Sequence, residues 1–152
     1  MYVGIEVTDD KIIAKPGVEP WLQDSIEVRI DARPDAVRSA GTGENEMTDF
    51  AFINISPGTV ATAPYIFKPE KLPPGCKYAC LRTKDGYTAE IAIPLSYFAE
   101  KGGKDWDGFR LNLCVNDYDS EKGPRKQFLW KPDWRSWSTV KSYAGSGSFF
   151  LP

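Results

Sequence analysis

Apolar and polar residues alternate one by one in several short stretches along the chain. This period of two is typical of β-strands with one face against a core and one face in solvent. The clearest stretches are Tyr2–Val7, Ser25–Asp31, Phe50–Ile55, Gly86–Pro94 and Phe109–Tyr118. Weaker ones are Tyr78–Thr83, Arg125–Trp130 and Ser148–Leu151. The pattern predicts a protein built mostly of strands.

The segments between these stretches are rich in proline and glycine, which favour turns and interrupt helices. Only Pro94–Glu100, "PLSYFAE", has the pattern of a helical turn, with proline at a favoured first position. Many short strands separated by turns predict an all-β fold, an antiparallel β-sandwich of immunoglobulin-like or jelly-roll-like architecture. The length of 152 residues suits a single domain, residues 1–152.

The strand patterns also predict which side chains face a ligand. In Phe109–Tyr118 the inward positions are Phe109, Leu111, Leu113 and Val115, and the outward positions are Arg110, Asn112, Cys114 and Asn116. In Ser25–Asp31, Glu27 and Arg29 point outward beside the apolar positions. Glu27, Arg29 and Asn116 are therefore candidate contacts for a polar ligand, although an ordinary solvated strand face has the same pattern.

Charge and composition exclude several functions. The net charge of -2 provides no basic surface for a nucleic-acid backbone, and no apolar run is long enough to span a bilayer. The chain contains no histidine, which excludes Ser-His-Asp and Cys-His nucleophile systems. Its three cysteines lack the partners of a zinc site, and we interpret them as thiols or small core residues. The start of the chain lacks a signal-peptide pattern, which indicates either a cytoplasmic protein or a mature domain.

Five tryptophans lie at strand ends and in loops rather than inside apolar runs, at Trp21, Trp106, Trp130, Trp134 and Trp137. Any one of them could fill the core, because an indole buries a large apolar area. Three within eight residues are harder to bury together. An exposed indole plane can stack on the C–H face of a sugar ring while polar groups at its edge bind the hydroxyls. The pattern favours sugar binding for Trp21, with structural packing as the alternative.

Four blocks in order, "YVGIEVTDD", "PWLQDSIEVRIDAR", "DGYTAEIAIPLSYF" and "GFRLNLCVNDYD", followed by a tryptophan-rich segment and "GSFFL", resemble carbohydrate-binding module family 9. The resemblance runs through nearly the whole chain. It implies a non-catalytic β-sandwich module that holds the end of an oligosaccharide or polysaccharide, such as xylan or cellulose, between two tryptophans. It also implies structural calcium, a secreted or cell-surface location and covalent linkage to a polysaccharide-degrading enzyme.

The same resemblance assigns roles to individual residues. It implies that Trp21 forms one wall of the sugar site, with Glu27 as a polar contact, and that the second wall is Trp137 or, as second choice, Trp130. Family members usually have an arginine in the third block near the position of Ile53. They also begin with further strands, so this chain resembles a fragment of a longer domain or a variant whose sheet edge is covered in another way.

Two further interpretations concern carboxylates. Asp117, Asp119 and Glu121 in "NDYDSEKG" form an oxygen-rich loop suited to calcium, or else a solvated acidic turn, and Asp9–Asp10 is a weaker version. A glycosidase would need two carboxyls facing one cleft, and Glu27 and Glu90 are the pair to consider. A structural or adhesive sandwich without sugar binding is the remaining alternative.

Overall fold

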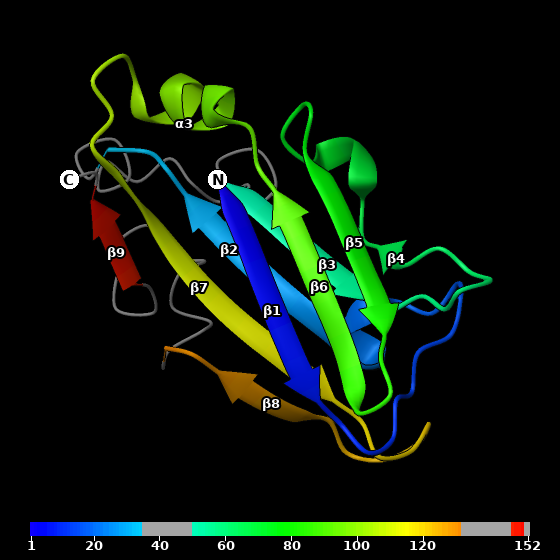
Figure 1. Ribbon diagram of the computed structural model, residues 1–152. Helices are drawn as coiled ribbons and strands as arrows, with labels where there is room; N and C mark the ends of the chain where they lie inside the picture. Colours follow the sequence, from blue (N-terminus) through cyan, green and yellow to red (C-terminus); the bar gives the residue numbers. More distant parts are fainter. Residues whose placement is uncertain (35–49, 132–146, 151–152) are drawn as a thin grey trace.

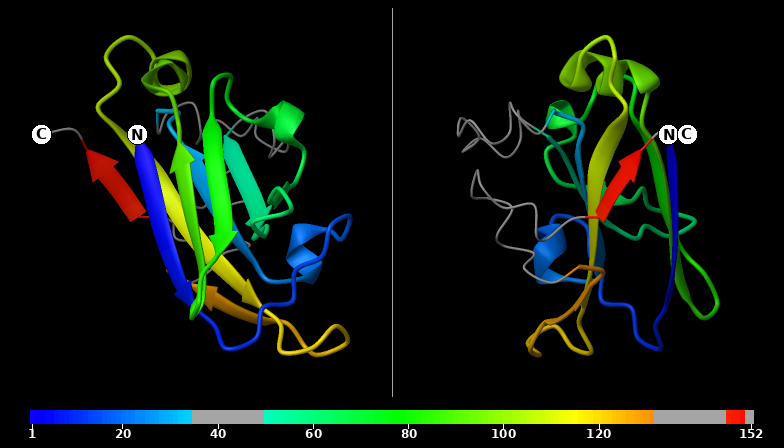
Figure 2. Two further views of the ribbon diagram at one scale, coloured as in Figure 1. Left: turned by 45° about the vertical axis from the view of Figure 1, so that its right-hand side comes forward. Right: turned by 90° about the vertical axis from the view of Figure 1, so that its left-hand side faces the viewer.

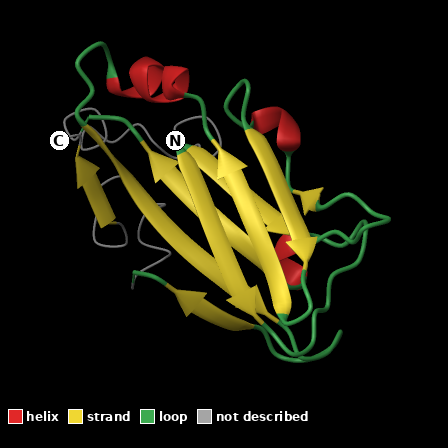
Figure 3. Ribbon diagram, in the orientation of Figure 1, coloured by secondary structure: helices red, strands yellow, loops and turns green. Residues whose placement is uncertain are grey.

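The computed structural model describes residues 1–34, 50–131 and 147–150. Two antiparallel β-sheets lie face to face, and a short helix closes one end between them (Figures 1 and 2). Strands account for most of the regular structure (Figure 3). The predicted β-sandwich is confirmed.

The smaller sheet has three strands in the order β1-β6-β5. Their bounds are Tyr2–Thr8 for β1, Gly86–Ala92 for β6 and Lys77–Arg82 for β5. In the β1–β6 pair, Val3 lies opposite Ile91 and Ile5 opposite Ala89. These apolar partners share the inner face, which is why the alternation in the two sequences matches.

The larger sheet has six strands. They run in the order β4-β3-β2-β7-β8, and β9 also pairs with β7. Their bounds are Tyr65–Ile66 for β4, Ala51–Ser56 for β3, Ser25–Asp31 for β2, Gly108–Asp117 for β7, Lys126–Leu129 for β8 and Gly147–Phe150 for β9. The sequence did not predict β4, because its two residues lie in a proline-rich connection with no room for alternation.

Helices are few and short among the described residues. The helix α3, Leu95–Gly102, follows Pro94 as predicted, and two 3-10 turns, η1 at Pro20–Leu22 and η2 at Pro69–Lys71, also begin at prolines. No helix in the described part of the chain has the length and hydropathy to cross a membrane.

The core lies between the sheets and is formed by the inner-face side chains of both. Ile26, Ile53 and Ile91 are fully or almost fully buried. The hydroxyl of Tyr97 on α3 accepts a hydrogen bond from the N–H of Ala51 (2.8 Å) and donates one to the carbonyl of Ile30 (3.0 Å). The helix is thereby fixed to the ends of β2 and β3.

Two cysteines belong to the buried interior. Cys80 and Cys114 are free thiols with no exposed area, and burial raises the pKa of each to about 12. Both thiols stay protonated and unreactive at neutral pH. The interpretation of these two cysteines as small core residues is confirmed.

Strand β7 departs from the prediction in how its two faces are buried. Phe109, Leu111, Leu113 and Val115 contact the core as expected, yet each is only partly buried. Asn112, Cys114 and Asn116, predicted to be solvated, are buried instead. The larger sheet extends beyond β1, so the inner face of β7 is incompletely covered (Figure 1). The prediction of a wet outer face is wrong for this strand.

Candidate functional site

Four polar side chains from three adjacent strands meet on the outer face of the larger sheet, the face turned away from the core. Glu27 of β2 lies opposite Asn54 of β3, and Ser25 of β2 lies opposite Asn116 of β7. Each alternates with an isoleucine or valine that faces the core. The alternation therefore positions the polar set as firmly as it positions the core.

Glu27 is held by a hydrogen-bond network although it is only 5% exposed. The Nδ2 group of Asn116 donates to Glu27 Oε1 at 2.9 Å and to Ser25 Oγ at 3.0 Å. Gln127 Nε2 on β8 donates to Asn116 Oδ1 at 2.9 Å, which fixes the orientation of the amide. A buried carboxylate is costly without such partners, so the network stabilises Glu27 as an acceptor.

Arg29 provides a positive charge beside this carboxylate. Its Nη2 atom lies 3.6 Å from Glu27 Oε2, and its guanidinium lies 5.0 Å from the centre of the Phe52 ring. Ile53 is fully buried on the inner face, so the outer-face positions of β3 belong to Phe52 and Asn54. The structure thus supplies a cation from β2 beside the outer face of β3.

Asn54 is a candidate site residue that the sequence reasoning missed. It has no exposed area, and neither its Nδ2 nor its Oδ1 atom has a hydrogen-bond partner among the described residues. Leaving a buried amide unpaired costs roughly 1 to 3 kcal/mol, which marks it as a group that a ligand could satisfy. The signal was present in the sequence, since Asn54 occupies an outward position of an alternating strand.

Trp21 is connected to this polar set through aromatic contacts. Its ring meets the edge of Phe67 at a centroid distance of 4.7 Å, and Phe67 lies 6.4 Å from Phe52. The backbone carbonyl of Trp21 accepts a hydrogen bond from the hydroxyl of Tyr118 at 3.0 Å. The indole is half-buried in a fixed turn, η1, and the structure brings it to the side of the sheet that carries Arg29 and Glu27.

The structure does not bring Trp130 into this site. Trp130 packs against Phe149, whose ring stacks on Phe109, an inner-face residue. It therefore lies on the opposite face of the larger sheet from Glu27, and its use as the second wall of the same site is wrong. Trp137, the first choice for that wall, lies outside the described residues, as does Trp134.

Glu27 and Glu90, the pair considered for glycoside hydrolysis, lie on opposite outer surfaces of the sandwich. Glu90 is on β6, where its exposed side chain points away from the core on the smaller sheet. Two carboxyls separated by both sheets cannot act on one bond, because hydrolysis needs them within about 10 Å. The glycosidase interpretation based on this pair is wrong.

A second group of carboxylates gathers at one end of the sandwich. The side-chain oxygens of Asp9, Asp24 and Asp117 all lie within 4.8 Å of one another. Asp24 is completely buried, and it accepts hydrogen bonds from the backbone N–H groups of Ile13 and Tyr118. Burial, assisted by the charges of Asp9 and Asp117, raises the pKa of Asp24 to about 6.

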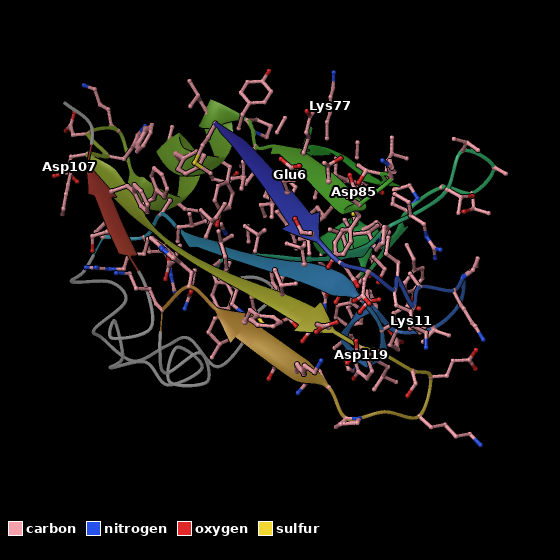
Figure 4. All side chains as sticks on the ribbon, turned by 60° about the horizontal axis from the view of Figure 1, so that its bottom comes forward. Glu6, Lys11, Lys77, Asp85, Asp107 and Asp119 are labelled. Atoms are coloured by element: carbon pink, nitrogen blue, oxygen red, sulfur yellow. The ribbon has the colours of Figure 1, made fainter. Side chains whose placement is uncertain are left out.

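The other two residues of the predicted metal set point elsewhere. Asp119 pairs with Lys126, and Glu121 pairs with Lys15, all with exposed side chains. Hydrogen bonds and charge from these lysines lower the pKa of each carboxyl. Figure 4 shows Asp119 and Lys11 at the end of the molecule away from Asp107. The side-chain oxygens of Asp117 therefore lie beside those of Asp9 and Asp24, while Lys126, 3.6 Å from Asp117 Oδ2, connects Asp117 to Asp119.

Comparison with known proteins places this geometry in a family. The family model described as "Carbohydrate family 9 binding domain-like" matches residues 1–145. The chain belongs to this carbohydrate family 9 binding domain-like family. The family is one of binding domains, and this agrees with a face built from hydrogen-bonding groups and aromatic rings. No curated protein sequence matches the chain.

Two solved structures share the fold of this family 9 domain. One is a carbohydrate binding module family 9 from Caldicellulosiruptor kristjanssonii in complex with glucose, with a TM-score of 0.67 and 20% identity over 99% of this chain and 70% of that chain. The other is a family 9 module from the same organism in complex with cellotriose, with a TM-score of 0.64 and 20% identity over 99% and 68% of the two chains.

Proposed function

We propose that the chain is a non-catalytic module that holds the terminal sugar of a plant-type polysaccharide or oligosaccharide on the outer face of the larger sheet. The observation that carries this proposal is the buried amide of Asn54, without a partner among the described residues, beside the Glu27–Asn116 network. Such a set of oriented donors and acceptors at the edge of an aromatic surface matches a sugar, which is polar at its rim and apolar on its faces.

We expect each residue to make a different kind of contact with the sugar. Glu27 accepts hydrogen bonds from sugar hydroxyls, Arg29 donates them, and Asn54 does both, because an amide carries an acceptor and two donors. The half-buried indole of Trp21 covers the C–H face of the ring. Trp137 remains our proposal for the opposite wall. The Asn116 and Gln127 amides already orient the Glu27 carboxylate. Because Glu27 is only 5% exposed and Asn54 has no exposed area, sugar binding requires a rearrangement that uncovers them.

Titration with glucose, cellotriose and xylotriose, monitored by calorimetry and by tryptophan fluorescence, tests the proposal. The two related structures contain glucose and cellotriose, and we use these sugars as probes for that reason. Replacing Glu27→Gln removes a charged acceptor worth roughly 1.5 to 3 kcal/mol, so we expect affinity to fall about 10- to 150-fold.

The matched control is Glu90→Gln, on the outer face of the smaller sheet, which we expect to bind like the unmodified protein. Absence of binding to all three sugars would favour a structural or adhesive sandwich. Release of shorter sugars during incubation with cellotriose or xylotriose would instead indicate an enzyme.

We also propose that the Asp9, Asp24 and Asp117 carboxylates hold a structural calcium ion. Oxygen ligands are those that calcium prefers, and three carboxylates so close together repel one another until a cation neutralises them. Calcium that binds only the folded state raises the melting temperature by mass action. We expect this increase to be lost in Asp117→Asn and kept in Glu121→Gln, and the reverse result would place the ion in the "NDYDSEKG" loop.

From the family resemblance we further propose that the domain works outside the cell, attached to a polysaccharide-degrading enzyme. Binding a chain end would keep such an enzyme near its substrate by raising the effective local concentration. Adding the domain to a glycoside hydrolase should then increase activity on insoluble cellulose or xylan without changing activity on a short soluble substrate.

A further inference from the structure

Asn54 lies between two neighbouring strands on the outer face of the larger sheet, with Glu27 of β2 opposite it on one side. On the other side is β4, which lies along the edge of β3 (Figure 1). Ile55 pairs with Ile66, and the next bond joins the N–H of Phe67 to the carbonyl of Asn54 at 2.9 Å. Opposite residues of an antiparallel pair share a face, so the Phe67 side chain lies beside the Asn54 amide.

Aromatic contacts hold the Phe67 ring in this position. Its centroid is 4.7 Å from that of Trp21 and 6.4 Å from that of Phe52, with interplanar angles of 84° and 71°. Both are edge-to-face arrangements, which aromatic pairs favour. The Nζ atom of Lys68 lies 4.9 Å from the centre of the same ring. The half-buried ring therefore covers the outer face next to Asn54.

The ring keeps water from the Asn54 amide but cannot replace the hydrogen bonds that water would make. Asn54 has no exposed area, and its Oδ1 and Nδ2 atoms have no partner in the described part of the chain. A buried amide left unpaired raises the free energy of the free protein. A movement that lets a hydroxyl group reach the amide recovers this free energy, so the burial of Asn54 beside Phe67 favours opening toward a hydroxyl-bearing ligand.

The segment that carries Phe67 has few bonds to hold it in the sheet. β4 has only two residues and is the last strand at its edge of the described sheet. Lys68, the next residue, has a φ of 45° and is the only non-glycine residue with positive φ among residues 1–34, 50–131 and 147–150. This left-handed conformation is strained for a residue with a long side chain. Such strain is concentrated in binding sites and in segments that change conformation.

We propose that Phe67 is a gate to Asn54. In the free protein its ring covers the amide, and on sugar binding it turns away about Lys68, so that a sugar hydroxyl reaches Asn54. This inference rests on the proposed function and adds to it the residue that controls access to the site. Opening gives up the ring contacts with Trp21 and Phe52, and it gains hydrogen bonds to the amide and a free indole surface for the sugar.

Nuclear magnetic resonance tests the movement directly, with cellotriose as the probe. In the free protein, nuclear Overhauser effects should connect the ring protons of Trp21 and Phe67, whose centroids are 4.7 Å apart. Saturation with cellotriose should remove these effects and shift the side-chain amide signals of Asn54, which are identified by their loss in Asn54→Ser. Overhauser effects that persist in the saturated complex would overturn the gate.

Phe67→Ala removes the gate and should speed sugar binding. In the unmodified protein only the open fraction binds, so the association rate constant is reduced by that fraction. Loss of one edge-to-face contact should raise the rate constant about 2- to 12-fold. Stopped-flow tryptophan fluorescence with cellotriose measures it. Dissociation changes as well, because Trp21 loses a neighbour, so the association rate constant and not the affinity is the deciding quantity.

A second variant and a control complete the comparison. Phe67→Leu keeps an apolar side chain but no ring, and its association rate constant should lie between those of Phe67→Ala and the unmodified protein. The matched control is Phe150→Ala, because Phe150 is a 73% exposed ring on β9, away from β4 in the same sheet. It should bind at the unmodified rate. Unchanged or slower association in both Phe67 variants would overturn the gate and make Phe67 a support for Trp21.

The results separate this inference from the proposed function. If no sugar binds, both are wrong. If Glu27→Gln weakens cellotriose binding while the contact between Trp21 and Phe67 persists in the complex, the sugar site is correct and only the gate is wrong. Loss of that contact together with faster association in Phe67→Ala supports both.

Discussion

Trp21 carries the apolar half of the proposed sugar contact, and its surroundings determine what its removal should do. The indole is half-buried and touches Phe67 at its edge. Truncation in Trp21→Ala should therefore cost a modest amount of stability, about 1 kcal/mol for the aromatic contact. Sugar affinity should fall about 5- to 150-fold if stacking contributes roughly 1 to 3 kcal/mol, by analogy with stacked bases.

Leu22→Ala is the matched control, because this neighbour in the same turn is 56% exposed. It should lower neither affinity nor the melting temperature appreciably. Sugar titration and thermal unfolding of both variants give the comparison. If Trp21→Ala unfolds the domain, or keeps a demonstrated affinity, the indole serves packing and not binding.

For individual residues, the sequence identified site candidates that lie on regular strands. It missed groups of residues that only folding brings together. Glu27, Arg29 and Asn116 were found because alternation alone assigns a face. The carboxylate cluster was found only in part: Asp117 and Asp9 were candidate calcium ligands, but Asp24 was missed, and the three come from separate segments that only folding brings together. Asp24 also directly precedes a strand, where nothing in the local pattern indicates complete burial.

At the scale of the elements, two glycine substitutions test how closely the backbones of β1 and β6 approach each other. Gly86, with φ of 147°, lies where a Cβ atom would be 1.9 Å from the backbone oxygen of Val7. Gly86→Ala must displace β1 or change its own backbone, and it should destabilise the protein by more than about 2 kcal/mol. A Cβ atom added at Gly4 would meet nothing within 4 Å, so Gly4→Ala should stay within about 0.5 kcal/mol.

Urea unfolding of the two glycine variants measures the difference. Equal stability of both would show that β1 is not held against β6 in the register described. A loss confined to Gly86→Ala would support it, because both substitutions add the same methyl group to the same pair of strands.

The strands and the helix were largely predictable from the sequence. Which face of its sheet a side chain occupies, and how far that face is buried, was less predictable. Period-two alternation defined the long strands, since each has one apolar face. Trp130 directly follows β8 and its N–H still bonds to the carbonyl of Leu113, so alternation places it on the same face as Phe128. It was misplaced because the sequence does not show which face of β8 is on the inner side of the sheet. The partial exposure of Leu113 depends on the width of the opposite sheet, which a single strand does not encode.

For the whole molecule, the raised pKa of Asp24 predicts how stability changes with pH. Its pKa is about 6 in the folded protein against an ordinary value of 3.8, so the folded state holds this proton more tightly. Protonation therefore stabilises the fold. Without calcium, the free energy of unfolding should decrease as pH rises from about 4 to 6, by up to about 3 kcal/mol. Asp119 and Glu121 act in the opposite direction, but as exposed ion pairs they contribute little.

Denaturant unfolding at several pH values in the presence of chelator measures this dependence. Asp24→Asn should be less stable throughout, because it loses an acceptor for Ile13 or Tyr118, yet its stability should be nearly flat over the same pH range. A slope equal to that of the unmodified protein would contradict the assignment. Saturating calcium should remove the decrease in the unmodified protein.

The hydrogen bonds of Tyr97 to Ile30 and Ala51 have a consequence for how this domain can vary. They fasten the last pair of the β2–β3 ladder, and the chain leaves and re-enters the sheet at that point. Both bonds join residues at the ends of the two strands, so they help to set the register of β2 against β3. Doubling the length of a closed loop costs only about 0.6 kcal/mol. New sequence could be inserted between β2 and β3 while the two-sheet scaffold stays intact.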